Sequence, residues 1–195
     1  MRKKMKQRLR QMFPLDPDGK TFIIEAWLDN YDDIFNEWDP APFKRRDIDP
    51  DLVDFLEACG EDIPLKYPVS IRFMIKPQVR NKAQEASFVA GIHNYFRFSK
   101  QSVRKKLSET NRRILLYTLI AIAFLVIAIA SNQVETENLL VKTAVEGLFI
   151  GGWVFLWNAI ETVFFDARDI RFRYKFLERF HLADITFVDE PPGKK

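Results

Sequence analysis

Two glutamates and an asparagine interrupt an otherwise apolar stretch of the sequence, residues 144–165, and they are the residues best placed to do chemistry: Glu146, Asn158 and Glu161. Ionisable groups inside a membrane are costly and commonly functional. On a helix, the two glutamates would lie about 22 Å apart along the axis and about 60° apart around it. They could line a conducting pathway, or they could be ordinary interfacial charges, with Glu146 paired to Lys142 one turn earlier.

No other residue pattern predicts a catalytic centre, a metal site or a cofactor site. Cys59 is the only cysteine, which excludes an intrachain disulfide or a thiolate metal site within one chain. His93 and His181 are the only histidines and do not suggest a metal cluster. The acidic segment 47–51 resembles the start of a calcium loop, but Leu52 stands where the EF-hand turn requires glycine. The sequence therefore predicts a protein that is not an enzyme and needs no cofactor.

The clearest structural signal is a run of seventeen uncharged residues from Ile114 to Ala130. Such a helix rises about 26 Å, close to the ~30 Å hydrocarbon core of a bilayer. We expect a first transmembrane helix over 112–131, a short external loop over 132–142 and a second transmembrane helix over 143–165.

The charges around these segments predict the orientation of the chain. Arg112 and Arg113 precede the first span, and Arg168 and Arg171 follow the second, whereas residues 131–138 hold two glutamates and no Lys or Arg. The positive-inside rule then places both termini in the cytoplasm. The basic start of the chain leads into no apolar stretch, so we expect no cleavable signal peptide.

The N-terminal segment, residues 1–19, carries six Lys or Arg in its first ten positions, among them Lys3, Lys4 and Lys6. Apolar residues recur among them at helical spacing: Met5, Leu9, Met12 and Phe13. This pattern favours a helix on an anionic membrane surface, with a disordered basic tail as the alternative. Nucleic-acid binding is disfavoured, because a folded basic face with stacking aromatics is missing.

Between these segments the periodicity predicts a small α+β domain. We expect strands over 21–27, 69–75 and 184–188, and helices over 50–59, 82–130 and 166–180. Asp49 and Pro50 mark the start of the first of these helices, and Gly60 its end. The predicted fold is a two-layer cytoplasmic α/β domain, formed by residues 20–111 and 166–195, on a two-helix transmembrane hairpin.

Small residues in the two spans predict close helix packing. Gly147, Gly151 and Gly152 form a small-residue face on the second span, and Ala128 is expected at a similar depth on the first. The contact could lie within one chain or between two copies.

Three segments of the sequence resemble a widespread family of uncharacterised prokaryotic two-span membrane proteins. They are FNEWDPAPFKRRDIDPDLVDFLEA at 35–58, IHNYF at 92–96 and EGLFIGGWVFLWNAIE at 146–161. The resemblance implies the same architecture in a prokaryotic inner membrane, and it implies no activity, cofactor or partner.

Together these features predict a membrane-anchored scaffold or binding module. Its expected partners are the lipid bilayer, further copies of itself and another membrane or cytoplasmic protein. The alternative is a subunit of a homo-oligomeric pore lined by Glu146, Asn158 and Glu161, since two helices alone cannot enclose a channel.

Overall fold

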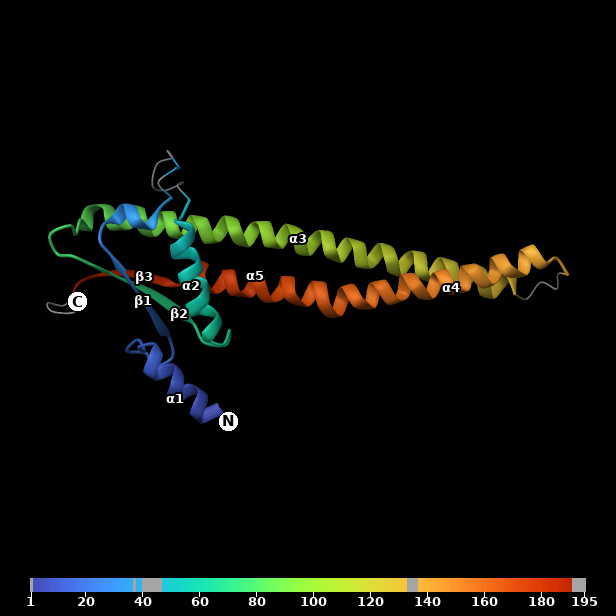
Figure 1. The fold of residues 1–195 in the computed structure, drawn as a ribbon, viewed down its shortest axis with the longest axis horizontal. Coiled ribbons are helices and arrows are strands. Elements are labelled where there is room, and N and C mark those ends of the chain that lie inside the picture. The colour runs from blue at the N-terminus through green and yellow to red at the C-terminus, as the bar shows by residue number, and fades with distance from the viewer. Residues whose placement is uncertain (1, 37, 40–46, 133–136, 191–195) are drawn as a thin grey trace. The chain divides into compact units, whose positions relative to one another are not determined.

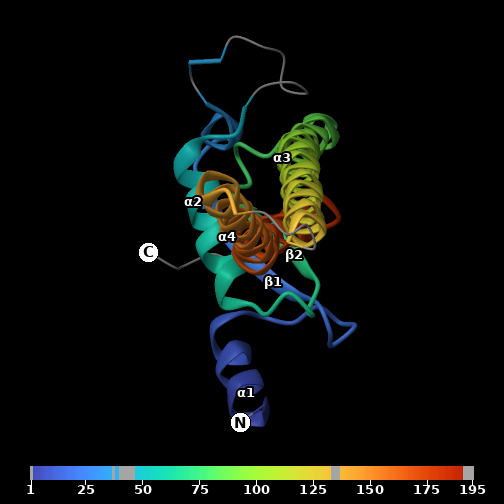
Figure 2. The ribbon, with the colours of Figure 1, turned by 90° about the vertical axis from the view of Figure 1, so that its right-hand side faces the viewer.

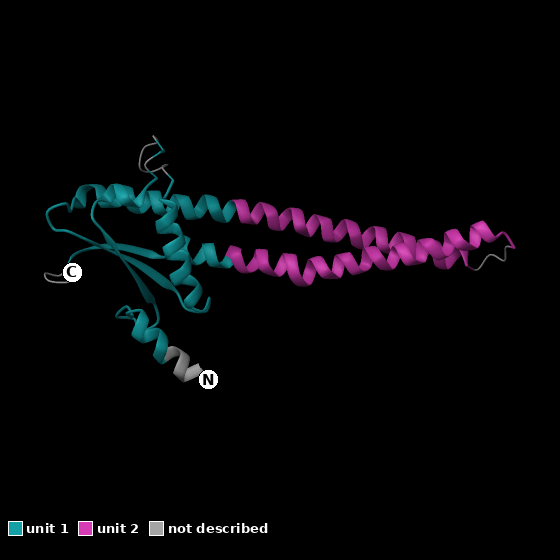
Figure 3. Cartoon of the chain, in the orientation of Figure 1, with its two compact units in different colours: residues 1–101, 175–195 teal, residues 102–174 magenta. Residues whose placement is uncertain are grey.

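The computed structural model describes residues 2–36, 38–39, 47–132 and 137–190, with side chains from residue 7 onward (Figure 1). The chain divides into two units (Figure 3). Residues 1–101 and 175–195 form the first, which we call the sheet unit, and residues 102–174 form the second, the hairpin unit. The sheet unit therefore combines segments from both sides of the hairpin unit in the sequence.

The sheet unit contains three parallel strands in the order β1-β2-β3, which confirms the predicted α+β class. Their bounds are Phe22–Leu28 for β1, Val69–Ile75 for β2 and Asp184–Asp189 for β3. Parallel neighbours require crossover connections. The first crossover contains the short helix η1 (Tyr31–Ile34) and helix α2 (Pro50–Asp62), and the second contains the entire hairpin unit.

Helix α2 begins as the sequence predicts and ends later. Asp49 caps it, because its side chain accepts a hydrogen bond from the N–H of Asp51 at 2.9 Å, and Pro50 is its first residue. The predicted end at Gly60 is wrong, since the helix continues to Asp62. Gly60 serves packing instead: a Cβ there would lie 2.7 Å from the ring of Phe180.

One face of the sheet forms the core with the helices. Strand alternation places Ile24, Ile71 and Ile185 in one row and Ala26, Phe73 and Phe187 in the next. The helical side of this core is largely aromatic. Its fully buried rings include Phe35, Phe88, Phe96, Phe176 and Phe180. Phe96 and Phe180 stack at 5.1 Å between centroids and join the first part of helix α3 (Lys82–Ser131) to the end of helix α5 (Ala167–His181).

The opposite face, which we call the outer sheet face, holds the alternate strand residues Glu25, Trp27, Arg72, Met74, Thr186 and Val188. Glu25 and Arg72 form a cross-strand ion pair at 3.2 Å. Trp27 is 49% exposed, and Thr186 is also exposed. The N-terminal helix α1 (Arg2–Met12) precedes β1, and the N–H of Ile23 donates to the carbonyl of Pro14 at 2.9 Å.

The hairpin unit, residues 102–174, is formed by parts of two long helices whose other ends belong to the sheet unit. Helix α3 extends over Lys82–Ser131, in agreement with the predicted 82–130. A second helix runs from residue 139 to 181 as α4 (Leu139–Glu161), one π-helical turn labelled η2 (Thr162–Asp166) and α5 (Ala167–His181). Both are long and apolar enough to cross a membrane. Only 11% and 6% of the residues in their most apolar 18-residue windows are buried within the chain.

Helices α3 and α4 run side by side in opposite directions (Figures 1 and 2). Tyr117 contacts Phe155 early in the pair, at 5.9 Å between ring centroids, and Gly152 packs on Leu125 about two turns further along α3. Ala121 is completely buried between them. Small residues at these positions allow the two backbones to approach closely.

Candidate functional site

The three polar residues of the second span all lie on the exposed surface of α4. At ~100° per residue, Glu161 lies about 180° from the buried Gly152, and Glu146 about 120° from it. Both carboxylates therefore point away from α3. The amide of Asn158 donates to the carbonyl of Val154 at 2.8 Å and so remains on its own helix.

Neither glutamate forms an ion pair with a described residue, and the expected partner Lys142 is not within 4 Å of Glu146. An unpaired carboxylate is costly in hydrocarbon. If α4 crosses a membrane, the two positions therefore need water, a lipid headgroup or another protein chain around them.

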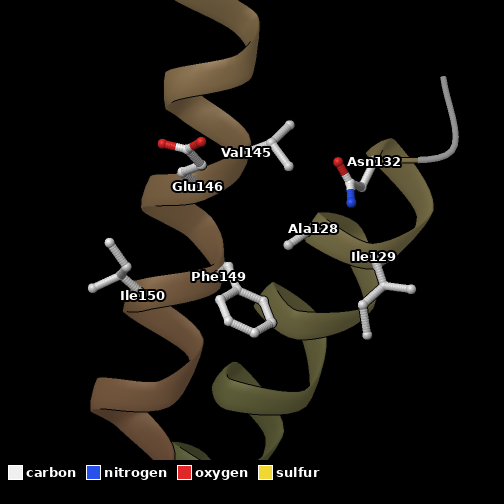
Figure 4. Close-up of a pocket in the computed structure, with 7 residues that line it drawn as sticks. All are labelled: Ala128, Ile129, Asn132, Val145, Glu146, Phe149 and Ile150. Carbon is white, nitrogen blue, oxygen red and sulfur yellow. The ribbon is translucent and has the colours of Figure 1, made fainter. Parts of the chain in front are cut away.

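A pocket of about 430 Å³ lies between the last turns of α3 and the first turns of α4 (Figure 4). Its lining is mainly apolar and comprises Ala128, Ile129, Asn132, Val145, Glu146, Phe149 and Ile150. In Figure 4 the carboxylate of Glu146 points away from α3, and Asn132 stands on the opposite side of the pocket. A hard cation takes six or more oxygen ligands. The lining of this pocket contains one carboxylate, and no group of three His, Cys, Asp or Glu side chains that could hold a metal ion occurs in the described ranges.

The three glycines of α4 lie on two different surfaces of the helix. Gly151 and Gly152 face α3, where a Cβ would meet Phe124 at 3.2 Å and Leu125 at 2.7 Å. Gly147 differs, because a Cβ there would meet nothing within 4 Å. Ala128 is buried at the depth expected for it, but its neighbours across the pocket include Val145 and Phe149. The close packing within the chain therefore involves two of the three glycines.

Four of the basic residues expected at a membrane surface are exposed in the hairpin unit: Arg112, Arg113, Arg168 and Arg171. The side chains of Lys3, Lys4 and Lys6 lie outside the described residues. In α1 and just after it, Leu9 and Phe13 are buried, and Met12 is 52% exposed. Two of the apolar residues expected to enter a leaflet are therefore used inside the protein.

A charged cluster at the carboxyl ends of the strands could not be predicted from the sequence. Arg80 pairs with Glu85 at 2.8 Å and Asp189 at 3.0 Å and donates to the carbonyl of Phe187 at 2.8 Å. Hydrogen bonding to Glu85 is the main reason why the pKa of Arg80 is raised. This edge of a parallel sheet commonly binds ligands. Here the guanidinium is occupied by the protein's own acceptors, and the cluster holds β3 to the start of α3.

Arg179 is a second charged residue whose role could not be predicted from the sequence around it. It is buried, and its guanidinium donates to the carbonyls of Ile63 at 2.8 Å and Gly60 at 2.6 Å. Burial lowers its pKa to about 10. A cation at the last carbonyls of α2 is favourable because of the helix dipole. Arg179 thus connects α5 to the end of α2 through these hydrogen bonds.

His93 and His181 form a reciprocal pair between α3 and α5. The Nδ1 atom of each lies near the main-chain carbonyl of the other, at 2.9 and 3.3 Å. A carbonyl only accepts, so both Nδ1 atoms carry the proton. Burial is the main reason why the pKa of His181 is lowered.

Comparisons with protein-family models, with curated proteins and with solved structures found no match to this chain. The resemblance to a family of two-span prokaryotic proteins therefore stays a prediction.

Proposed function

We propose that the chain is a non-enzymatic, membrane-anchored scaffold whose sheet unit binds a partner through the outer sheet face. The observation that supports this proposal is the combination of polar and exposed aromatic side chains on that face. Its one ion pair, Glu25 with Arg72, is internal, while Trp27 beside it is half exposed. Exposed aromatic side chains next to satisfied polar groups are typical of protein-binding surfaces.

The strand pairing supports a hairpin that enters and leaves the membrane on one side. β2 precedes the hairpin unit, β3 follows it, and the two strands pair from Ser70 to Ile75 with Asp184 to Asp189. Paired strands must occupy the same compartment, so the segment between them crosses a bilayer an even number of times. With the basic flanks, this favours cytoplasmic termini in a prokaryotic inner membrane.

The test is site-specific crosslinking in native membranes. A photoreactive phenylalanine analogue replaces Trp27, and in a matched control it replaces Phe55, which is exposed on α2. We expect a discrete product from position 27 alone, either with another protein or with a second copy of the 23.0 kDa chain. Identical patterns from the two positions, or no product from either, would contradict the proposal.

A homo-oligomeric pore is the second candidate, and the unpaired carboxylates of Glu146 and Glu161 favour it. In a closed ring these groups would face water instead of lipid. Ion flux into liposomes separates the two candidates. A pore predicts that Glu161→Gln changes cation selectivity while Glu109→Gln, an exposed site outside the apolar run, does not. A scaffold predicts no flux in either variant and unchanged crosslinking at Trp27.

A further inference from the structure

The π-helical turn at Thr162–Asp166 changes the surface of the second long helix. The N–H of Ala167 donates to the carbonyl of Thr162, five residues earlier, so this turn holds one residue more than an α-helical turn. Phe164 and Phe165 are both about two-thirds exposed. Single π turns inside α-helices occur frequently at functional sites.

A groove of about 530 Å³ lies on this surface. Its lining spans about three helical turns and comprises Trp157, Ile160, Glu161, Phe164, Phe165 and Arg168. Its apolar residues belong to α4 and the π turn, and Arg168 belongs to the first turn of α5. Arg171 follows one turn later and is also exposed.

We propose that this groove binds one anionic phospholipid, with its phosphate at Arg168 and an acyl chain along Trp157, Ile160 and Phe164. Aromatic rings belong at the boundary between headgroups and acyl chains, and arginine attracts the phosphate of anionic lipids. The order of the lining residues along the helix matches the order of these parts in a lipid. The proposal rests on the membrane insertion argued above.

The negative charge of Glu161 allows a specific prediction about lipid binding. Its carboxylate lines the same groove and forms no ion pair with a described residue. It repels a phosphate held at Arg168. Removing the positive charge should therefore weaken lipid binding, and removing the negative charge should strengthen it. A second copy of the chain seated in the groove would show no dependence on the lipid headgroup.

The test uses tryptophan quenching by brominated lipids. Trp157 is retained as the only tryptophan of the full chain by W27F, W38F and W153F, and the protein is placed in phosphatidylcholine vesicles. A minor fraction of the lipid is brominated phosphatidylglycerol or, for comparison, brominated phosphatidylcholine. We expect phosphatidylglycerol to compete about fivefold better at Trp157, the effect of roughly one charge near an anionic headgroup.

Matched variants show which residues cause the preference for phosphatidylglycerol. Arg168→Gln should abolish the preference, Glu161→Gln should increase it, and Arg104→Gln, exposed outside the groove, should leave it unchanged. A chain that retains only Trp153, one turn from Trp157 and outside the groove, should show no preference.

The outcomes separate the two proposals. If alkaline carbonate washes the chain off the vesicles, membrane insertion fails and the lipid site fails with it. If the chain stays inserted and both lipids quench Trp157 equally, only the lipid site is overturned. If the chain stays inserted and neither lipid quenches Trp157, protein covers the groove and the lipid site is again overturned.

Discussion

Arg179 shows how one buried residue can determine how helices meet. Its two main-chain acceptors precede it by 116 and 119 positions. Its charge is balanced by helix-terminal carbonyls and by the rings of Phe176 and Phe180, at 5.3 and 5.6 Å from the guanidinium carbon. No local pattern could have predicted this arrangement, because it arises only when α2 and α5 pack together.

Replacing Arg179 by methionine should destabilise the sheet unit by about 2 kcal/mol. The variant keeps most of the apolar stem but leaves the carbonyls of Gly60 and Ile63 without their charged donor. Thermal unfolding in detergent, followed by circular dichroism, measures the effect. Arg171→Met, on the exposed side of α5, is the control and should be nearly neutral; equal losses in both variants would refute the role of Arg179.

The histidine pair predicts a specific pH dependence. His181 has a lowered pKa in the folded state, so the neutral ring contributes stability above the unfolded pKa of about 6.5. That contribution is lost as the pH falls through the folded pKa. We expect less denaturant to unfold the chain at pH 5 than at pH 7. His181→Asn, which keeps a donor for the carbonyl of His93, should reduce this difference, and an unchanged difference would contradict the assignment.

At the scale of elements, the sequence predicts the position of each strand along the chain better than the relative direction of neighbouring strands. The predicted limits of β2 match the structure, those of β1 are displaced by one residue, and β3 extends one residue beyond its predicted end. Alternation identifies the buried face of a strand, but it carries no information on whether neighbours are parallel. The π turn was also missed, because the segment TVFFD has no distinguishing composition.

For the candidate site, too, only part of the arrangement could be predicted from the sequence. A common side of the helix for Glu146 and Glu161 could be predicted from their spacing. That this side faces away from α3 could not, because it depends on which face of α4 the small residues bring against its neighbour.

The packing of α3 on α4 predicts opposite tolerances for two glycines of one helix. Gly152→Val should lower stability by about 1–3 kcal/mol, because the new side chain overlaps Leu125 and approaches the carbonyl of Ala121 at 3.3 Å. Gly147→Val should be nearly neutral, since its Cβ enters open space. Thermal unfolding of the two variants in the same detergent makes the comparison. A larger loss at Gly147 would mean that this residue is covered by another chain.

At the scale of the whole molecule, the topology of the chain can be tested directly. In a Cys59→Ala background, a cysteine substituted for the exposed Asn132 at the end of α3 should react with an impermeant thiol reagent added to intact cells. Arg104→Cys, in the other flank of the first span, should react only after lysis. The reverse pattern would show that the termini face outward.

The placement of the hairpin unit between β2 and β3 also has a consequence for biosynthesis. The ribosome produces β1, α2 and β2 first, and the strand that completes the sheet is made only after both long apolar helices have been synthesised. Until then, one edge of β2 has no partner. In the proposed topology, a chain whose second apolar helix failed to cross back would leave β3 on the opposite side of the membrane from β2. The open edge of the sheet would then be exposed to aggregation and to proteases. In that topology, completion of the sheet unit depends on correct membrane insertion.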